Sequence, residues 1–131
     1  AALAHIGATG VVKDRMDGMK IMAGAAKALG AAKAGAIPFS PELARRAAAD
    51  LRTSAVAARD QFPEGSLERP SEASPAIWTD RETFDRILEE LIAAADALEA
   101  AAEDEAAARA AADAVARTCK DCHGKFREKK L

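Results

Sequence analysis

The sequence predicts an all-α fold, an antiparallel four-helix bundle that runs up-down-up-down. Ala accounts for 36 of the 131 residues, whereas aromatic residues make up 4% and Tyr is absent. Ala favours helices, and β-branched and aromatic residues favour strands, so this composition argues against a sheet. Apolar residues also recur every three or four positions in four blocks of about 20 residues each. A chain of this length supports one domain, here residues 1–131.

The first predicted helix covers residues 10–33 and ends before Gly35 and Pro38. The apolar spacing predicts an inward stripe on one face of this helix. The residues of this stripe are Val12, Met16, Met19, Ala23, Ala26 and Leu29.

The second predicted helix covers residues 41–61 and ends at Phe62-Pro63. Ser40, Pro41 and Glu42 supply an N-cap, a Pro at the first helical position and an acid in the first turn. Its apolar stripe is weak, so we expect this helix to be the least tightly packed of the four. The stripe consists of Leu43, Ala47, Leu51, Ser54 and Ala58.

Residues 64–75 are polar and rich in Pro, which predicts a long loop of the kind that often lies over a functional site. The capping-box pattern Thr79-Asp80-Arg81-Glu82 begins the third helix, which extends to about Ala101. The last helix begins near Asp104. The two inward stripes are Phe84, Ile87, Leu88, Leu91, Ala95 and Leu98, then Ala108, Ala112, Val115, Cys119, Cys122 and Phe126.

The charge and hydropathy of the sequence argue against a nucleic-acid-binding protein and against a membrane-spanning one. A net charge of −2 argues against a nucleic-acid binder held by bulk charge. Charged residues interrupt every apolar run before it reaches the roughly 20 residues of a membrane span. The start Ala1-Ala2-Leu3 has neither an initiator Met nor a signal peptide, as expected for a mature form. No nucleophile–base pair or carboxylate pair is identifiable, so we expect no enzyme.

The pentapeptide Cys119-Lys120-Asp121-Cys122-His123 has the C-x-x-C-H form of covalent c-type haem attachment. Two Cys three residues apart on one helical face can each form a thioether with a haem vinyl group. The next residue, His123, can then bind the iron from one side. The tether retains haem in a domain too small to hold it by burial alone.

Two other interpretations of the Cys pair remain open. A dithiol–disulfide redox pair also uses C-x-x-C, but it favours a helix N-terminus beside a βαβ unit. A zinc site needs four ligands, and the only complete set is Cys119, Cys122, His123 and the distant His5. Adjacent Cys122 and His123 chelate a tetrahedral metal poorly.

The whole chain resembles the class II c-type cytochromes, which comprise cytochromes c′ and low-spin relatives of the cytochrome c-556 type. The motif Cys122-His123-Gly124-Lys125-Phe126-Arg127 matches the family's C-terminal pattern, and Val12-Lys13-Asp14-Arg15 resembles its opening motif. Phe62-Pro63, Pro75-Ala76-Ile77-Trp78 and Phe84 resemble its loop and third-helix landmarks. The turn after Lys33 is one residue longer than usual, which is a departure.

The resemblance implies that function depends on the sixth iron position. A Met ligand there makes the iron low-spin, whereas a small apolar residue leaves an open site for gases such as NO or CO. Counting four residues from Arg15 places Met19 at this position, with Met16 second and Met22 third. The alternative is that these Met residues only fill the core. Ligation by His5 requires the N-terminus to fold back over the haem edge.

Further roles follow from the same resemblance. Arg15 is the candidate to pair with a haem propionate, because a guanidinium matches a carboxylate bidentately. Arg127, one turn after His123, adds positive charge on the imidazole side or simply complements the helix C-terminus. The aromatic residues expected on or near the macrocycle, or in a plain core role, are Phe84, Phe126 and Trp78.

The sequence therefore predicts a periplasmic monohaem cytochrome with one haem c, ligated by His123 and Met19, that carries electrons. The alternatives are a gas-binding cytochrome c′ and a haem-free thiol-redox or structural bundle. We expect redox partner proteins, and a homodimer through the first two helices is compatible with their small Ala-rich faces. A basic cluster either steers an acidic partner or is only the cationic end of a helix. It comprises Lys120, Lys125, Arg127, Lys129 and Lys130.

Overall fold

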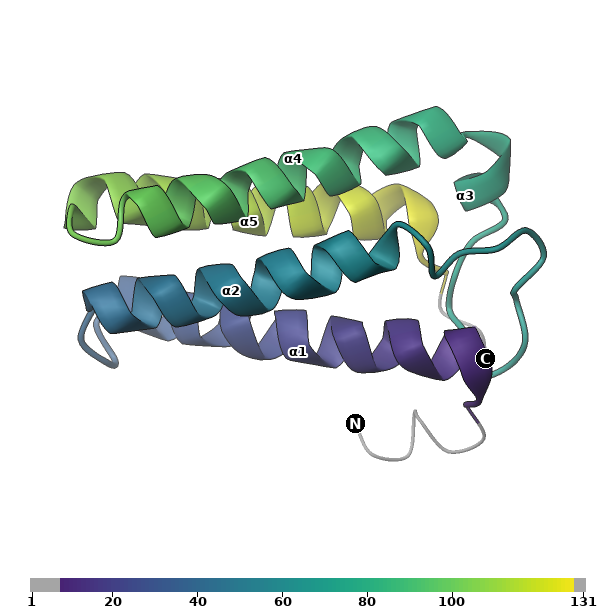
Figure 1. Ribbon diagram of the computed structural model, residues 1–131, viewed down its shortest axis with the longest axis horizontal. Helices are drawn as coiled ribbons and strands as arrows, with labels where there is room; N and C mark the ends of the chain where they lie inside the picture. The colour runs from purple at the N-terminus through teal and green to yellow at the C-terminus, as the bar shows by residue number, and fades with distance from the viewer. Residues whose placement is uncertain (1–7, 129–131) are drawn as a thin grey trace.

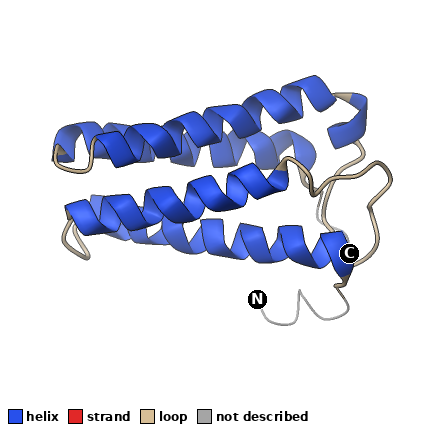
Figure 2. Cartoon of the chain, in the orientation of Figure 1, coloured by secondary structure: helices blue, strands red, loops and turns tan. Residues whose placement is uncertain are grey.

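The computed structural model describes residues 8–128, which form an antiparallel bundle of four long helices (Figure 1). The helices are α1 (Gly10–Lys33), α2 (Pro41–Ala58), α3 (Ala76–Thr79), α4 (Arg81–Ala100) and α5 (Glu105–Phe126). Helices and loops make up this part of the chain (Figure 2). An isolated bridge between Ala73 and Arg127 is its one β-type pairing. The predicted fold class is therefore confirmed. The extra element, α3, is a single turn inside the region before α4.

Three of the long helices begin at a side-chain cap. Ser40 Oγ accepts a hydrogen bond from the Leu43 N–H at 3.1 Å, as predicted for α2. Asp104 Oδ1 accepts from the Ala107 N–H at 3.2 Å and begins α5. The prediction for α4 is wrong by one residue, because Thr79 ends α3 and Asp80 caps α4 by accepting from the Thr83 N–H.

The expectation that α2 is the most loosely packed helix is wrong. α2 ends at Ala58, earlier than predicted, yet Ala44, Leu51 and Ala55 are fully buried. It packs extensively against both α1 and α4. The reason is that Ala side chains let neighbouring backbones approach closely, so a helix with weak hydrophobicity is buried on two sides.

The inward stripe predicted for α1 is rotated from the one observed. Met16, Met19 and Ala26 are only half-buried, and Ala23 is exposed. Val12 and Leu29 are buried as predicted, and the structure also buries Arg15, Met22, Ala25 and Ala32. α1 packs extensively on α2 and touches α5 over only a short region, so its buried face is turned toward α2. The half-buried stripe with Met16 and Met19 therefore lies outside the α1–α2 contact.

The stripes of α4 and α5 agree with the sequence prediction. All six α4 residues of the stripe are buried, and on α5 Ala108, Ala112, Val115 and Phe126 are buried. Cys119 and Cys122 are half-buried and pack against the same core. Among the described residues, no helix is long and apolar enough to cross a membrane.

Residues 59–75 form the long loop predicted from the sequence. The loop crosses the end of the bundle at which α1 begins and α5 ends (Figure 1). Its contacts with these two helices position the site described next.

Candidate functional site

The C-x-x-C-H motif lies in the last turns of α5. Cys119 and Cys122 share one face of the helix because three residues make almost one full turn. Both thiols are free and half-buried against the core, whereas His123 is exposed. The helix thus presents two thiols side by side and an imidazole next to them, close to its C-terminus.

The environment of the thiols disfavours thiol-redox chemistry. Burial raises the pKa of the Cys119 thiol, and burial together with the neighbouring Cys119 raises the pKa of Cys122 to about 11. Thiol-disulfide catalysts need the opposite, a thiol pKa lowered toward neutrality. This Cys pair is therefore poorly suited to act as a nucleophile.

The structure gives no support to a zinc site. Across residues 8–128, no group of three or more His, Cys, Asp or Glu side chains is placed to hold a metal ion. The only complete ligand set required His5, which lies outside the described residues.

The three Met residues of α1 differ in their surroundings. Met22 is 6% exposed and belongs to the hydrophobic core. Met19 is half-buried and packs against that core, as do Cys119 and Cys122. Met16 is also half-buried, but it is not one of the partly buried residues within 8–128 that pack against the core. Met19 is thus the partly accessible Met that packs against the core cluster, as the two Cys do.

Gly18 lies on the side of α1 that faces α2. A Cβ added at Gly18 would lie 3.9 Å from Ser54 Cβ, which is ordinary van der Waals contact. Gly18 therefore faces α2, in agreement with the rotated burial of α1.

The chemistry of the side chains fits a covalently attached haem between α1 and α5. α5 provides two thiols for thioether bonds and an imidazole, which is a common axial ligand of haem iron. α1 provides a half-buried thioether at Met19, and the two helices touch only over a short region. His123 and Met19 could act as ligands from two different helices.

Arg15 anchors the long loop to the start of α1. It is 4% exposed, and its Nη1 donates to Gln61 O at 3.1 Å and to Ser66 Oγ at 2.6 Å. Its Nη2 donates to Ser71 Oγ at 2.8 Å and to Ser66 O. The guanidinium carbon lies 4.5 Å from the centroid of the Phe62 ring.

These contacts give Arg15 a role that the sequence did not predict. Its partners are neutral oxygens, and burial lowers the pKa of its guanidinium. Four of the five guanidinium N–H groups are used by the loop. Pairing of Arg15 with a haem propionate stays a prediction.

Arg127, directly after α5, forms an ion pair with Glu72 near the C-terminal end of the same loop. Its Nε and Nη2 donate to Glu72 Oε1 at 2.9 and 2.6 Å. Although His123 is exposed as a residue, partial burial of its ring chiefly lowers the pKa of the imidazole, Arg127 lowers it further, and Glu72 raises it. Both charges therefore act on the imidazole. Glu72 was missed by sequence analysis, because an acid in a polar loop has no distinguishing local signal.

Two of the three described members of the predicted basic cluster form ion pairs. Lys125 forms an ion pair with Asp80, and Arg127 pairs with Glu72. The other described member, Lys120, is exposed, and Lys129 and Lys130 lie outside the described residues. These ion pairs favour the simpler interpretation, the cationic end of a helix.

Two of the predicted aromatic residues, Phe84 and Phe126, pack in a row with Phe62 at this end of the core. The Phe84 ring centroid lies 4.9 Å from that of Phe62 and 5.4 Å from that of Phe126, both in edge-on geometry. All three rings are buried. Trp78 Nε1 donates to Phe62 O at 3.0 Å. The structure gives these residues core contacts, and contact with a macrocycle stays a prediction.

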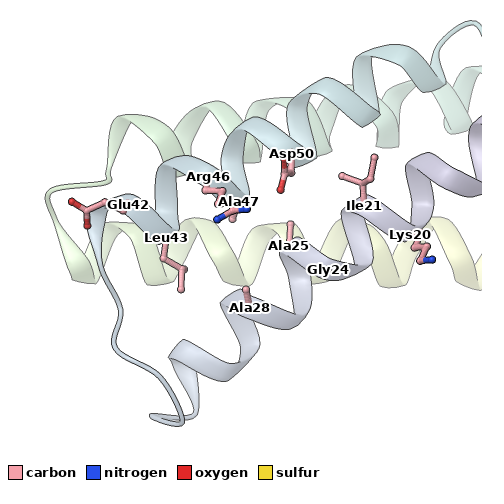
Figure 3. Close-up of a pocket in the computed structure, with 10 residues that line it drawn as sticks. All are labelled: Lys20, Ile21, Gly24, Ala25, Ala28, Glu42, Leu43, Arg46, Ala47 and Asp50. Carbon is pink, nitrogen blue, oxygen red and sulfur yellow. The ribbon is translucent and has the colours of Figure 1, made fainter. Parts of the chain in front are cut away.

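A separate open groove of about 620 Å³ lies between α1 and α2 (Figure 3). Ile21, half-exposed, stands at its edge with Lys20, while Ala25 and Ala47 form part of its floor. None of the predicted haem-site residues lines it.

Comparison with known proteins gives consistent matches over nearly the whole chain. Residues 10–127 match the family model described as Cytochrome C'. The chain is 37% identical over 122 residues to cytochrome c-556 of Agrobacterium tumefaciens (strain II Chrys), covering 92% of this chain and 99% of that protein. It is 32% identical over 123 residues to cytochrome c' of Rhodopseudomonas palustris (strain ATCC BAA-98 / CGA009), with 93% and 84% covered. A solved structure of cytochrome c' from Rhodopseudomonas palustris superposes with a TM-score of 0.86 at 31% identity, covering 95% and 100%.

Proposed function

The chain belongs to the cytochrome c′ family and is a monohaem c-type cytochrome with haem c bound through Cys119 and Cys122, and we propose that it is a low-spin electron carrier. His123 and Met19 are the proposed axial ligands, within a single haem domain over residues 1–131. When bound, the haem iron supplies reversible one-electron chemistry.

The observation that carries this proposal is the position of Met19. Of the three Met residues on α1, it is the one that is accessible in part and packed against the same core as Cys119 and Cys122. A Met thioether favours ferrous iron and so raises the reduction potential. Covalent attachment to α5 holds the haem in place, while α1 determines which side chain faces the iron.

The test is the visible spectrum of the ferric holoprotein with and without Met19→Ala. We expect a low-spin spectrum with a sulfur-to-iron charge-transfer band in the wild type and loss of both features in the variant. Met16→Ala is the matched control, since Met16 is also half-buried on α1, and it should keep both features. An unchanged spectrum in Met19→Ala contradicts the ligand role.

The alternative is a five-coordinate, gas-binding cytochrome c′, with Met19 only covering the iron. It is supported by the matched relatives, which include proteins of both names, cytochrome c-556 and cytochrome c'. A high-spin ferric spectrum and ready CO binding by the wild type would favour it. Slow or undetectable CO binding supports Met ligation.

The proposed setting is the periplasm, where the protein exchanges electrons with redox partner proteins rather than turning over a substrate. Haem attachment and the similarity to cytochromes c′ and c-556 support this setting. Fractionation of cells that produce the protein, followed by haem staining, checks the location.

We also propose a homodimer through α1 and α2. The groove between them combines an apolar floor with charges of both signs, Lys20 and Arg46 against Glu42 and Asp50. A second copy related by a two-fold axis can therefore match apolar surface and opposite charges. Ile21→Glu should give a monomer in sedimentation analysis. Ile37→Glu, at the other exposed large apolar residue within residues 8–128, should leave the dimer intact.

A further inference from the structure

The Glu72 carboxylate accepts two hydrogen bonds from the guanidinium of Arg127, the residue that follows the C-terminal end of α5. Arg127 Nε and Nη2 both donate to Glu72 Oε1, at 2.9 and 2.6 Å. Arg127 is the extended residue directly after α5, four residues beyond His123, and its positive charge acts on the His123 imidazole. Charge-assisted hydrogen bonds of this kind are stronger than neutral ones and fix the plane of the guanidinium.

The backbone around Glu72 is held independently of its carboxylate. The Glu128 N–H donates to Glu72 O at 2.7 Å, and the neighbouring Ala73 forms an antiparallel bridge with Arg127. On the other side, Ser71 Oγ accepts from Arg15 Nη2 at 2.8 Å. The segment that carries Glu72 is therefore attached to both α1 and α5, and its side chain can be changed without releasing it.

We propose that Glu72 is a positioning residue that holds the Arg127 guanidinium beside the His123 imidazole. This inference rests on the proposed function, because it takes His123 as the axial ligand. The side chains of Arg127 and Glu72 remain 47% and 37% exposed, so without the carboxylate the guanidinium is free to move into solvent. Held beside the imidazole, its positive charge opposes a further positive charge at the iron and favours the ferrous state.

The test is a double-mutant cycle on the midpoint reduction potential of the holoprotein. Glu72→Ala removes a negative charge, which raises the potential, and releases Arg127, which lowers it. In an Arg127→Ala background only the first effect remains. We therefore expect the potential shift caused by Glu72→Ala to be less positive when Arg127 is present. Equal shifts in the two backgrounds, or no shift in either, would overturn the proposal.

Two further variants make the result specific. Glu72→Gln keeps an acceptor for the guanidinium, so its shift should match the one that Glu72→Ala gives in the Arg127→Ala background. Glu64→Ala removes an acid from an exposed position of the same loop and should leave the potential unchanged. A shift with Glu64→Ala equal to that with Glu72→Ala would mean that loop charge alone acts, which contradicts positioning.

The ligand role of His123 is checked separately by the NMR signal of its ring nitrogen proton in the reduced wild type. A signal without the shift that a haem ring current causes contradicts the proposed ligand. A normal ligand signal together with additive potentials contradicts only the role of Glu72.

Discussion

α5 and α1, the two helices that flank the proposed haem site, hold their functional side chains in different ways. On α5, Cys119, Cys122 and His123 lie within five consecutive residues, so the regular helix alone brings them together. On α1, Met16, Met19 and Met22 span two turns, and their exposure differs because of what packs around the helix. The attachment side is set locally, whereas the opposite side is set by tertiary packing.

This difference explains how one fold can serve more than one function. Rotation of α1, or exchange of one of its side chains, changes the group that faces the iron without disturbing covalent attachment on α5. The solved cytochrome c' has this fold, and the relative named cytochrome c-556 matches this chain over 92% of its length. If Met19 is the sixth ligand, as proposed, the choice between electron transfer and gas binding depends on α1.

The largest expected effect comes from removing the attachment side. Cys119→Ala/Cys122→Ala should abolish covalent haem completely, because both thioether bonds are lost. Intact mass after denaturation and organic extraction measures this directly. Met19→Ala is the control and should keep the covalent mass, since α1 takes no part in attachment. Haem that stays bound after denaturation in the double variant would contradict the assignment.

A smaller effect is expected where α1 is anchored to the loop. Arg15→Ala leaves the acceptors at Ser66 and Ser71 without their donor in a buried setting, so the free energy of unfolding should fall by about 3 kcal/mol. Unfolding by guanidinium chloride, followed by circular dichroism, measures this loss of stability. Arg15→Lys should recover part of the loss, because it keeps the charge but not the planar fork.

The matched control for this anchor lies two residues earlier on the same helix. Lys13 forms an exposed ion pair with Asp17, and Lys13→Ala should leave stability nearly unchanged. A loss as large as that of Arg15→Ala would mean that any charge at the start of α1 matters. That result would contradict the anchoring of the loop by Arg15.

The sequence predicts best what is set by neighbours in the chain. The caps at Ser40 and Asp104, the α4 stripe and the C-x-x-C-H motif each depend on spacings of a few residues. The α1 stripe was right at Val12 and Leu29 but wrong at its other four members, because periodicity shows that a helix has an apolar face but not which neighbour covers it. Here α1 turns toward α2, so Met22 is buried instead of Met19.

The contacts of the long loop could not be predicted for a related reason. Arg15 bonds Ser66 and Ser71, and Arg127 bonds Glu72, across more than 50 residues. Ser and Glu are common in exposed loops, so nothing in the local sequence distinguishes these partners. The resemblance to the family marked both Arg residues but not the loop residues that hold them.

The smallest expected effect separates the core Met from the site Met on α1. Met22 is 6% exposed, so Met22→Ala should lower the free energy of unfolding of the holoprotein by about 2 kcal/mol, at the low end of the range for core truncation. The low value is expected because Ala has the higher helix propensity and recovers a few tenths of a kcal/mol.

Met16→Ala is the matched variant on the same helix, and it should cost less than about 1 kcal/mol because Met16 is only half-buried. Urea unfolding of the two variants, followed by circular dichroism, measures the difference. The two variants also distinguish the observed orientation of α1 from the one predicted by periodicity, in which Met16 faces inward and Met22 does not. If Met16→Ala proved the more destabilising, the helix would be rotated as the sequence predicted, and the position assigned to Met19 would have to be reconsidered.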